Sequence, residues 1–225
     1  MRKPRIILGL TGSPDSSRAP EILAKLRKFA DVAVVLTDRA QHFVDCQELE
    51  KACGPCTVPN SVARKFNYFT DSDEWNWSRT EKDGTPYYSA KWQPGDLILH
   101  EQLDIWANLI VIAPADPDVM ARLDIGLAND LLTLAVSRSS GWRPCILAPS
   151  LWPYGMTEIK RFIYVHEELG GGMSETERIV EVVKSTLPKG MNEDDNTGAG
   201  RGKKSLGAGG RRNPRTRKKS RLRQR

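Results

Sequence analysis

The sequence predicts an α/β fold, a doubly wound parallel sheet in three layers with helices on both faces, formed by residues 1–187. Short apolar runs alternate along the chain with segments in which apolar residues recur at helical spacing. The runs are apolar at almost every position, which is typical of parallel strands buried on both faces. Residues 188–225 show neither pattern, so the prediction is one domain followed by a tail.

The first half of the domain contains three predicted strands and one helix. Residues 6–10 form an apolar run that ends in a Gly-Ser turn, and residues 32–36 form a second run. Between them, Pro20 suits the first turn of a helix with one apolar face. Residues 65–69 are predicted as the third strand.

The second half continues the alternation of strands and helices. The predicted elements are, in order, a helix at 98–106, a strand at 109–113, one helix at 119–136, strands at 144–148 and 162–165, and a helix at 174–187. Ser174 and Glu177 have the spacing of a capping box, which predicts that the last helix begins just after Ser174.

The positive charge of the chain lies in its tail. The formal net charge is +6, with 34 Lys and Arg against 28 Asp and Glu. Residues 201–225 hold twelve of the basic residues and no acid, which leaves 22 basic and 28 acidic residues elsewhere. Residues 188–225 lack the apolar surface that would offset their ordering entropy, so we expect a disordered basic tail. Nucleic-acid binding or nuclear import is expected only through this tail, with a solubilising role as the alternative.

The remaining composition favours a cytoplasmic protein, or a nuclear one if the tail directs it there. No apolar run reaches 18 residues, so no membrane-spanning segment is predicted. The N-terminal apolar run is too short for a signal peptide, so the four cysteines are expected to be reduced.

Candidate binding residues follow the predicted strands, because ligands of doubly wound sheets bind outside the carboxyl ends of the strands. These residues are Gly12 and Ser13, Thr37 to Arg39, Pro114 to Asp116, and Pro149 and Ser150. In the loop at Gly9–Ser13, small residues allow close approach to a phosphate, to which free N–H groups and the Ser13 hydroxyl would donate. An ordinary strand-to-helix turn is the alternative for this loop.

The cysteines and the histidines give weaker signals. Cys53 and Cys56 have the spacing of a redox motif, but a polar, helix-like segment precedes them instead of a buried strand. With His42 and Cys46 they match no common zinc spacing, so free thiols are expected and no metal centre is predicted. His100 lies at an apolar strand–helix junction, where either a structural or a catalytic role is open.

Residues 68–77 mix aromatic and acidic side chains. Such a segment suits a ligand site or a subunit interface, and we favour the interface because exposed aromatic residues are enriched there.

Several motifs together resemble the phosphopantothenoylcysteine decarboxylase family, which includes halotolerance-type regulators of protein phosphatases. The resemblance covers residues 5–187, and its order and spacing are more specific than any single motif. The matching stretches are 10–13, 34–43, 70–75, 99–107, 112–114 and 126–133, with a weaker match at 170–179.

The resemblance implies a flavodoxin-like (Rossmann-like) sheet, assembly as a homo- or hetero-trimer, and FMN bound between subunits. It implies that His100 is catalytic in the decarboxylation of a phosphopantothenoylcysteine-like substrate in coenzyme A biosynthesis. In that chemistry FMN first oxidises the cysteine thiol end of the substrate. The residues implied to contact FMN are Gly12, Ser13, Thr37, Arg39, Phe43, Pro114, Ala115, Asp116, Pro117 and Ser150.

The chain also departs from the family pattern. Asp118 and Trp152 stand where the family has asparagines, and Val165 stands where it has a proton-donating cysteine. Three interpretations stay open. The chain is an FMN-dependent decarboxylase, either alone or as a His-donating subunit completed by a partner. The alternatives are a non-enzymatic subunit that binds a protein phosphatase and an oxidative cysteine decarboxylase whose reaction ends at the enethiol.

Overall fold

A computed structural model describes most of the predicted domain. The described residues are 3–59, 65–75, 77–80, 86–89, 92, 94–139, 143–151, 158–167 and 172–187. They all lie in one compact unit, Met1–Met191. The predicted tail and Trp152 lie outside the described residues.

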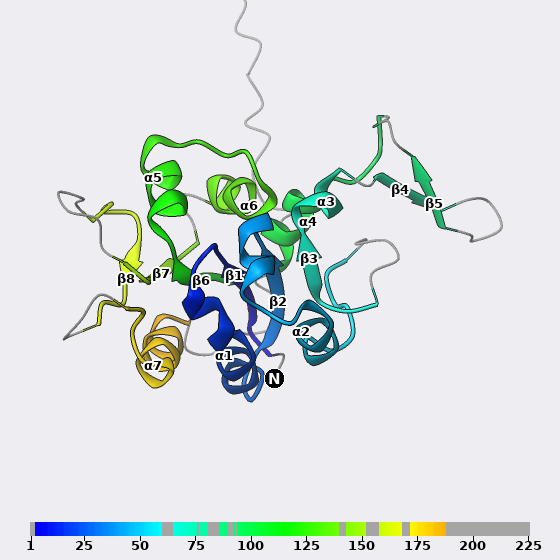
Figure 1. The fold of residues 1–225 in the computed structure, drawn as a ribbon. Coiled ribbons are helices and arrows are strands. Elements are labelled where there is room, and N and C mark those ends of the chain that lie inside the picture. The colour runs from blue at the N-terminus through cyan, green and yellow to red at the C-terminus, as the bar shows by residue number, and fades with distance from the viewer. Residues whose placement is uncertain are drawn as a thin grey trace, which may run out of the picture. The chain divides into compact units, whose positions relative to one another are not determined.

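Six parallel strands form the central sheet (Figure 1). Their order, β3-β2-β1-β6-β7-β8, reverses direction between β1 and β6, as in the Rossmann arrangement. The fold class is therefore confirmed. The strands are β1 (Arg5–Leu10), β2 (Asp31–Leu36), β3 (Tyr68–Thr70), β6 (Leu109–Ala115), β7 (Cys145–Pro149) and β8 (Ile163–Tyr164).

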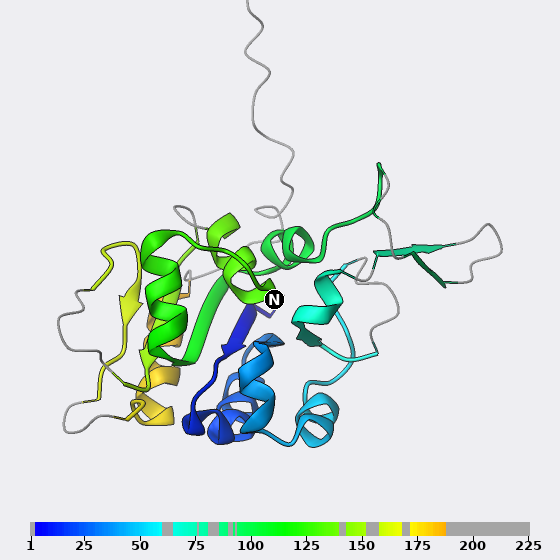
Figure 2. The ribbon, with the colours of Figure 1, turned by 45° about the horizontal axis from the view of Figure 1, so that its top comes forward.

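Helices cover both faces of this sheet, so the domain has three layers, with the sheet in the middle (Figures 1 and 2). Successive residues of β1 point to opposite faces, so Ile6 and Leu8 enter one apolar core and Ile7 enters the other. The first core packs against α1 (Ala19–Leu26), α2 (Cys46–Ala52) and α7 (Thr176–Thr186). The second packs against α4 (Leu99–Trp106), α5 (Pro117–Ile125) and α6 (Leu131–Ser139).

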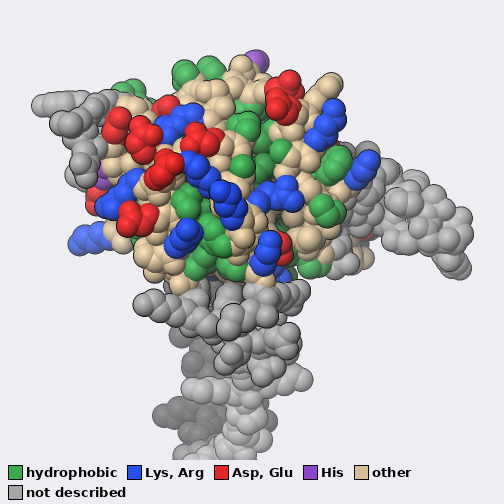
Figure 3. Space-filling view, turned by 90° about the horizontal axis from the view of Figure 1, so that it is seen from below, with side chains coloured by type: hydrophobic (Ala, Val, Ile, Leu, Met, Phe, Trp, Pro, Cys, Tyr) green, Lys and Arg blue, Asp and Glu red, His purple; other side chains and the backbone are tan. Residues whose placement is uncertain are grey.

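The outer face of the first helix layer carries charges of both signs. Figure 3 shows this side from below, with acidic and basic side chains interspersed. Lys25 pairs with Glu21 at 2.8 Å and also with Glu177, and Arg18 lies 3.5 Å from Glu175. Such a face is typical of solvated helices, and no helix in the described part of the chain is long and apolar enough to cross a membrane.

Two of the predicted element boundaries are wrong. The strand predicted at 65–69 begins only at Tyr68, because Phe66 pairs with Pro55 and the Asn67 side chain accepts from the Thr57 N–H at 2.8 Å. The capping box predicted at Ser174 does not form. The hydroxyl of Ser174 donates to the His166 carbonyl oxygen at 3.1 Å, and α7 begins after Glu175 with no side-chain cap.

Several short elements are absent from the prediction. They are the hairpin of β4 (Trp77–Thr80) and β5 (Pro86–Ser89), the helix α3 (Asp71–Glu74), and the 3-10 helices η1 (Pro14–Arg18) and η2 (Asp38–His42). The three helical segments have four or five residues and begin at capping side chains, so they leave no apolar period to detect.

The single helix predicted at 119–136 is also wrong, because the segment forms two helices. Gly126 ends α5 in the left-handed conformation with φ of 74°, and α6 starts only at Leu131. We expect Gly126→Ala to lower the free energy of unfolding by about 1–2 kcal/mol, the cost of a left-handed alanine. No atom lies within 4 Å of the added Cβ, so the cost is one of backbone conformation alone.

Urea unfolding followed by circular dichroism measures this cost. Gly126→Asn is the matched control and should lose less, because asparagine tolerates the left-handed region. Equal losses for the two variants would show that the backbone conformation of Gly126 is not the cause.

Candidate functional site

Hydrogen bonds join the loops after β1 and β6 at the switch point of the sheet, which is the place between these two strands where the strand order reverses. The Thr11 hydroxyl donates to the Pro114 carbonyl oxygen at 2.9 Å and accepts from the Asp116 N–H at the same distance. At the next strand, the Ser150 N–H donates to the Ala115 carbonyl oxygen at 3.1 Å. The predicted site residues of three strands therefore meet at one edge of the sheet.

Asp116 organises this edge. One carboxylate oxygen accepts from the Gly12 N–H at 2.8 Å, and the other accepts from the Val119 N–H at 2.7 Å and so caps α5. A Cβ on Gly12 would lie 2.7 Å from the Arg39 Cβ and 3.1 Å from an Asp116 oxygen. Glycine is thus required at position 12 by the close approach of the segments after β2 and β6.

The N–H groups of the loop after β1 are already engaged. Those of Gly12, Ser13, Asp15 and Ser16 have acceptors in Asp116, Thr11 and Ser13, at 2.8 to 3.3 Å. Pro14 has no N–H to donate. The expectation of free N–H donors is therefore wrong for Gly12 and Ser13, and a phosphate there would meet the Ser13 hydroxyl or would have to displace one of these internal bonds.

A cavity of about 300 Å³ opens beside this edge, a size at the lower end for small-molecule sites. Of the predicted cofactor residues, Thr37, Arg39 and Asp116 line it, while Gly12 adjoins it through Asp116. Phe43 is exposed and Ser150 is buried, and neither contributes to the lining. The described residues that line it are Thr37, Asp38, Arg39, Asp71, Asp116, Asp118, Arg122, Asn129 and Asp130.

Among the described residues, the cavity wall has five aspartates and two arginines, which is an excess of acidic side chains. Burial raises the pKa of Asp71 above its usual range, and the neighbouring Asp130 carboxylate adds to this shift. Arg122 contacts Asp130 and lies 3.0 Å from Asp118. Burial alone would lower the pKa of Arg122, but the carboxylates of Asp130 and Asp118 raise it above its usual value. The Arg122 Nε atom is buried and has no hydrogen-bond partner among the residues that the structure describes.

His100 lies in the first turn of α4 and is held by Glu74 of α3. Its Nδ1 atom lies 2.7 Å from one oxygen of Glu74, and its backbone N–H donates to the other oxygen at 3.0 Å. Glu74 is 2% exposed and the His100 side chain is 18% exposed. His100 does not line the cavity, but α3 connects the two, because Asp71 of the same helix does.

Sequence reasoning missed Glu74, Asp71 and Arg122 as site residues. For Glu74 a signal existed, since Ile98 precedes α4 and cannot cap its N-terminus, so an acceptor from another segment was required. In the mixed stretch at 68–77 the buried acids Asp73 and Glu74 bind other groups of the chain, while the interface favoured for this stretch stays a prediction. Trp75 alone among its described side chains is a large exposed hydrophobic group.

The four cysteines are free thiols, as expected. Burial raises the pKa of Cys53 to about 12, so this residue does not form the thiolate that redox exchange requires. Among the described residues, no three His, Cys, Asp or Glu side chains are placed to hold a metal ion.

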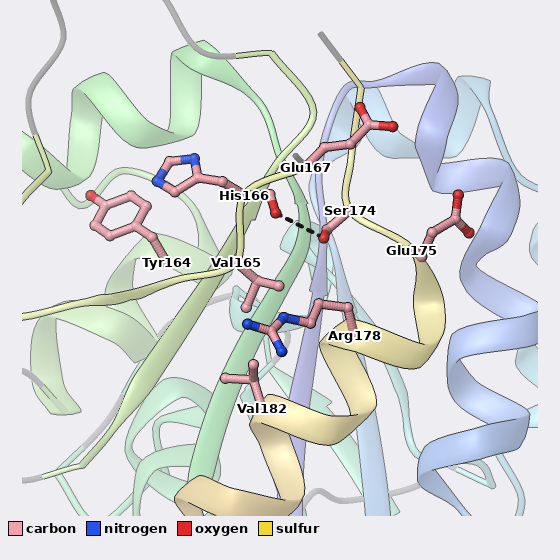
Figure 4. A pocket seen from close by; sticks show the side chains of 8 residues that line it. All are labelled: Tyr164, Val165, His166, Glu167, Ser174, Glu175, Arg178 and Val182. Carbon is pink, nitrogen blue, oxygen red and sulfur yellow. Dashed lines mark hydrogen bonds between the residues drawn. The ribbon is translucent and has the colours of Figure 1, made fainter. Parts of the chain in front are cut away.

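A second cavity, of about 570 Å³, lies between β8 and α7 (Figure 4). Val165, the position that the family resemblance matches to a cysteine, lines it together with Arg178 and Val182. Val165 is 2% exposed, and its N–H donates to the Leu147 carbonyl oxygen at 2.9 Å. Cys145 does not replace the lost thiol, since it is buried inside β7, where burial raises its pKa to about 12.

Comparison with known proteins assigns the family. The profile of the flavoprotein family matches residues 1–187. The chain belongs to the flavoprotein family. Mouse phosphopantothenoylcysteine decarboxylase is 27% identical to this flavoprotein over 209 residues, which cover 83% of the chain and 88% of the mouse protein. A probable phosphopantothenoylcysteine decarboxylase of Arabidopsis thaliana is 29% identical over 174 residues, which cover 75% of this chain and 72% of the Arabidopsis protein.

Solved structures support the fold of this flavoprotein. The FMN-binding protein AtHal3 has a TM-score of 0.62 at 23% identity, covering 82% of this chain and 96% of AtHal3. HAL3 from Cryptococcus neoformans has a TM-score of 0.60 at 23% identity, and the match covers 81% of this chain and 95% of HAL3. The resemblance inferred from the motifs is thus confirmed, and the identities mark a divergent member.

Proposed function

We propose that the protein is an FMN-dependent decarboxylase that acts on the cysteine end of a phosphopantothenoylcysteine-like substrate, the decarboxylation step of coenzyme A biosynthesis. The observation that carries this proposal is His100, held by a buried carboxylate on the helix pair that adjoins the cavity at the switch point. The relatives in mouse and Arabidopsis that cover most of the chain carry the name of this activity.

The cavity fits a flavin in its donors and acceptors. Arg122 lines the cavity, and its Nε–H has no hydrogen-bond partner among the described residues. The aspartates would accept from the hydroxyl and imide groups of FMN. Their excess charge disfavours a phosphate among them, so Thr37, Arg39 and the Ser13 hydroxyl are the groups left for the phosphate end. Phe43, Pro114, Ala115, Pro117 and Ser150 are proposed as further contacts from the family resemblance.

Bound FMN would supply the two-electron oxidation of the substrate's cysteine thiol end. His100 would transfer the proton that accompanies this oxidation. Val165 stands at the position of the family's proton-donating cysteine. The chain therefore has no thiol there to protonate the enethiol that is left after loss of CO₂. A reaction that ends at the enethiol is therefore the second candidate, and a hetero-trimer in which a partner supplies the missing acid is the other way to complete the site.

Titration with FMN, followed by flavin fluorescence, tests cofactor binding. We expect saturable binding by the wild-type protein and at least about tenfold weaker binding by Gly12→Ala, because relieving an overpacked contact costs about 1–3 kcal/mol. Gly9→Ala is the matched control. Its Cβ would lie 2.6 Å from the Leu132 side chain, away from the cavity, so stability should fall while FMN affinity stays unchanged.

If Gly12→Ala binds FMN as tightly as the wild type does, the loop after β1 is not part of the FMN site. If the wild-type protein does not bind FMN, the proposed function is contradicted. Release of CO₂ from phosphopantothenoylcysteine is then measured for the protein alone and for a mixture with a cysteine-bearing homologue. Turnover only in the mixture supports the hetero-trimer. Accumulation of enethiol by the protein alone supports the second candidate.

A further inference from the structure

The helix that carries His100 has no cap of its own. Ile98 occupies the N-cap position of α4 and offers no side-chain acceptor. The acceptor comes instead from Glu74, 26 residues earlier, whose carboxylate takes the His100 N–H with one oxygen and the imidazole Nδ1 with the other. One carboxylate therefore binds both the backbone and the ring of a single residue.

We infer that Glu74 is the positioning residue of His100 and leaves the imidazole Nε2 as the atom that exchanges protons with the substrate. This inference rests on the proposed function. A carboxylate only accepts hydrogen bonds, so the contact of 2.7 Å places the proton of the neutral ring on Nδ1. The second bond, to the backbone, prevents the carboxylate from rotating away from the ring. The buried position of Glu74 excludes water that would compete for either bond.

The short helix α3 is itself held in place by its other acids. Asp73 accepts from the Thr70 N–H at 2.7 Å and closes a capping box, and Asp71 accepts from the Leu131 N–H at 2.8 Å and so holds the start of α6. Asp71 also lines the cavity. The position of the His100 ring relative to the cavity is therefore set by α3, through three carboxylates with separate backbone partners.

A purely structural role, in which Glu74 only caps α4, is the alternative. The two roles differ in what they predict for the ring. A cap needs one acceptor oxygen and is indifferent to the tautomer of His100, whereas a positioning residue requires the Nδ1–H tautomer. Glu74→Gln separates them, because an amide keeps the shape and one acceptor oxygen but replaces the second oxygen by an NH₂ donor.

The experiment is ¹⁵N NMR of the histidine rings in full-length protein at a pH where they are neutral, with the His100 signals assigned by their loss in His100→Asn. In the wild type we expect the proton on Nδ1 and an unprotonated Nε2. In Glu74→Gln we expect the amide to donate to Nδ1 and the proton to move to Nε2. Glu101→Gln, next to His100 on α4 but paired with Arg138, is the matched control and should leave the His100 signals unchanged.

Kinetics give the second readout. Glu74→Gln should lower kcat by about 10- to 100-fold with little change in KM or FMN affinity, as expected for loss of an orienting partner. An Nε2–H tautomer in the wild type, or identical ring signals in the wild type and Glu74→Gln, would overturn the inference. Because the tautomer is read without substrate, a wild-type protein with the Nδ1–H tautomer but no turnover, either alone or mixed with the cysteine-bearing homologue, would refute the proposed function while leaving Glu74 as the residue that orients the ring.

Discussion

Replacing His100 by Asn should lower kcat for decarboxylation by about 10²- to 10⁴-fold, the range by which a positioned acid–base group accelerates a reaction. Asparagine retains the size and polarity of the side chain but has no group that exchanges a proton near neutral pH. The backbone N–H at this position can still donate to Glu74, so α4 should keep its cap. His100 does not line the cavity, and FMN affinity should stay at the wild-type value.

Single-turnover release of CO₂ and fluorescence titration with FMN measure the two quantities separately. His42→Asn is the matched control, because His42 is exposed and outside the cavity lining, and its kcat should equal that of the wild type. A His100→Asn protein that retains turnover within about twofold of the wild type would exclude His100 as the proton-transfer group. A loss of FMN affinity equal to the loss of turnover would make His100 a cofactor-binding residue instead.

Replacing Asp104 by Asn should lower the free energy of unfolding by about 3–5 kcal/mol, because it removes the carboxylate that balances the charge of a buried arginine. Asp104 of α4 is 1% exposed. It accepts from the Ser139 hydroxyl at 2.6 Å and from Arg143, and it lies 3.6 Å from Arg138. The Arg143 side chain is 11% exposed, and its burial lowers the pKa of the guanidinium, a sign that the charged form is costly there.

Thermal unfolding followed by circular dichroism measures this loss. For a domain of this size the decrease in Tm should be about 6–20 °C. Glu101→Gln is the matched control on the same helix. Its partner Arg138 is half exposed and 3.5 Å away, so the loss should stay below about 1 kcal/mol. Similar losses for the two variants would show that the buried pair contributes no more than a surface one.

The alternation of apolar runs and helical periods was sufficient to predict the doubly wound sheet. Residues 6–10 and 109–113 are apolar at nearly every position because both faces of these strands are covered by helices. This requirement can be detected from the local sequence alone. The same logic placed Gly12, Thr37 and Asp116 just after strands, and the structure gathers these three around one cavity edge. Helix breaks were harder to predict, since Gly126 ends α5 within an otherwise continuous helical period.

The sequence by itself thus determined the layers, the edge of the sheet at which a ligand is predicted, and His100 as a candidate. Only the tertiary structure decided what surrounds His100. Glu74 meets it across 26 residues, and Asp71 meets Leu131 across 60. These contacts depend on how α3 packs against α4 and α6, and the sequence spacing of two residues carries no information about such packing. The periodicity of a chain determines which face of each element is buried, whereas the polar groups that meet at the end of a sheet are determined only when the elements pack together.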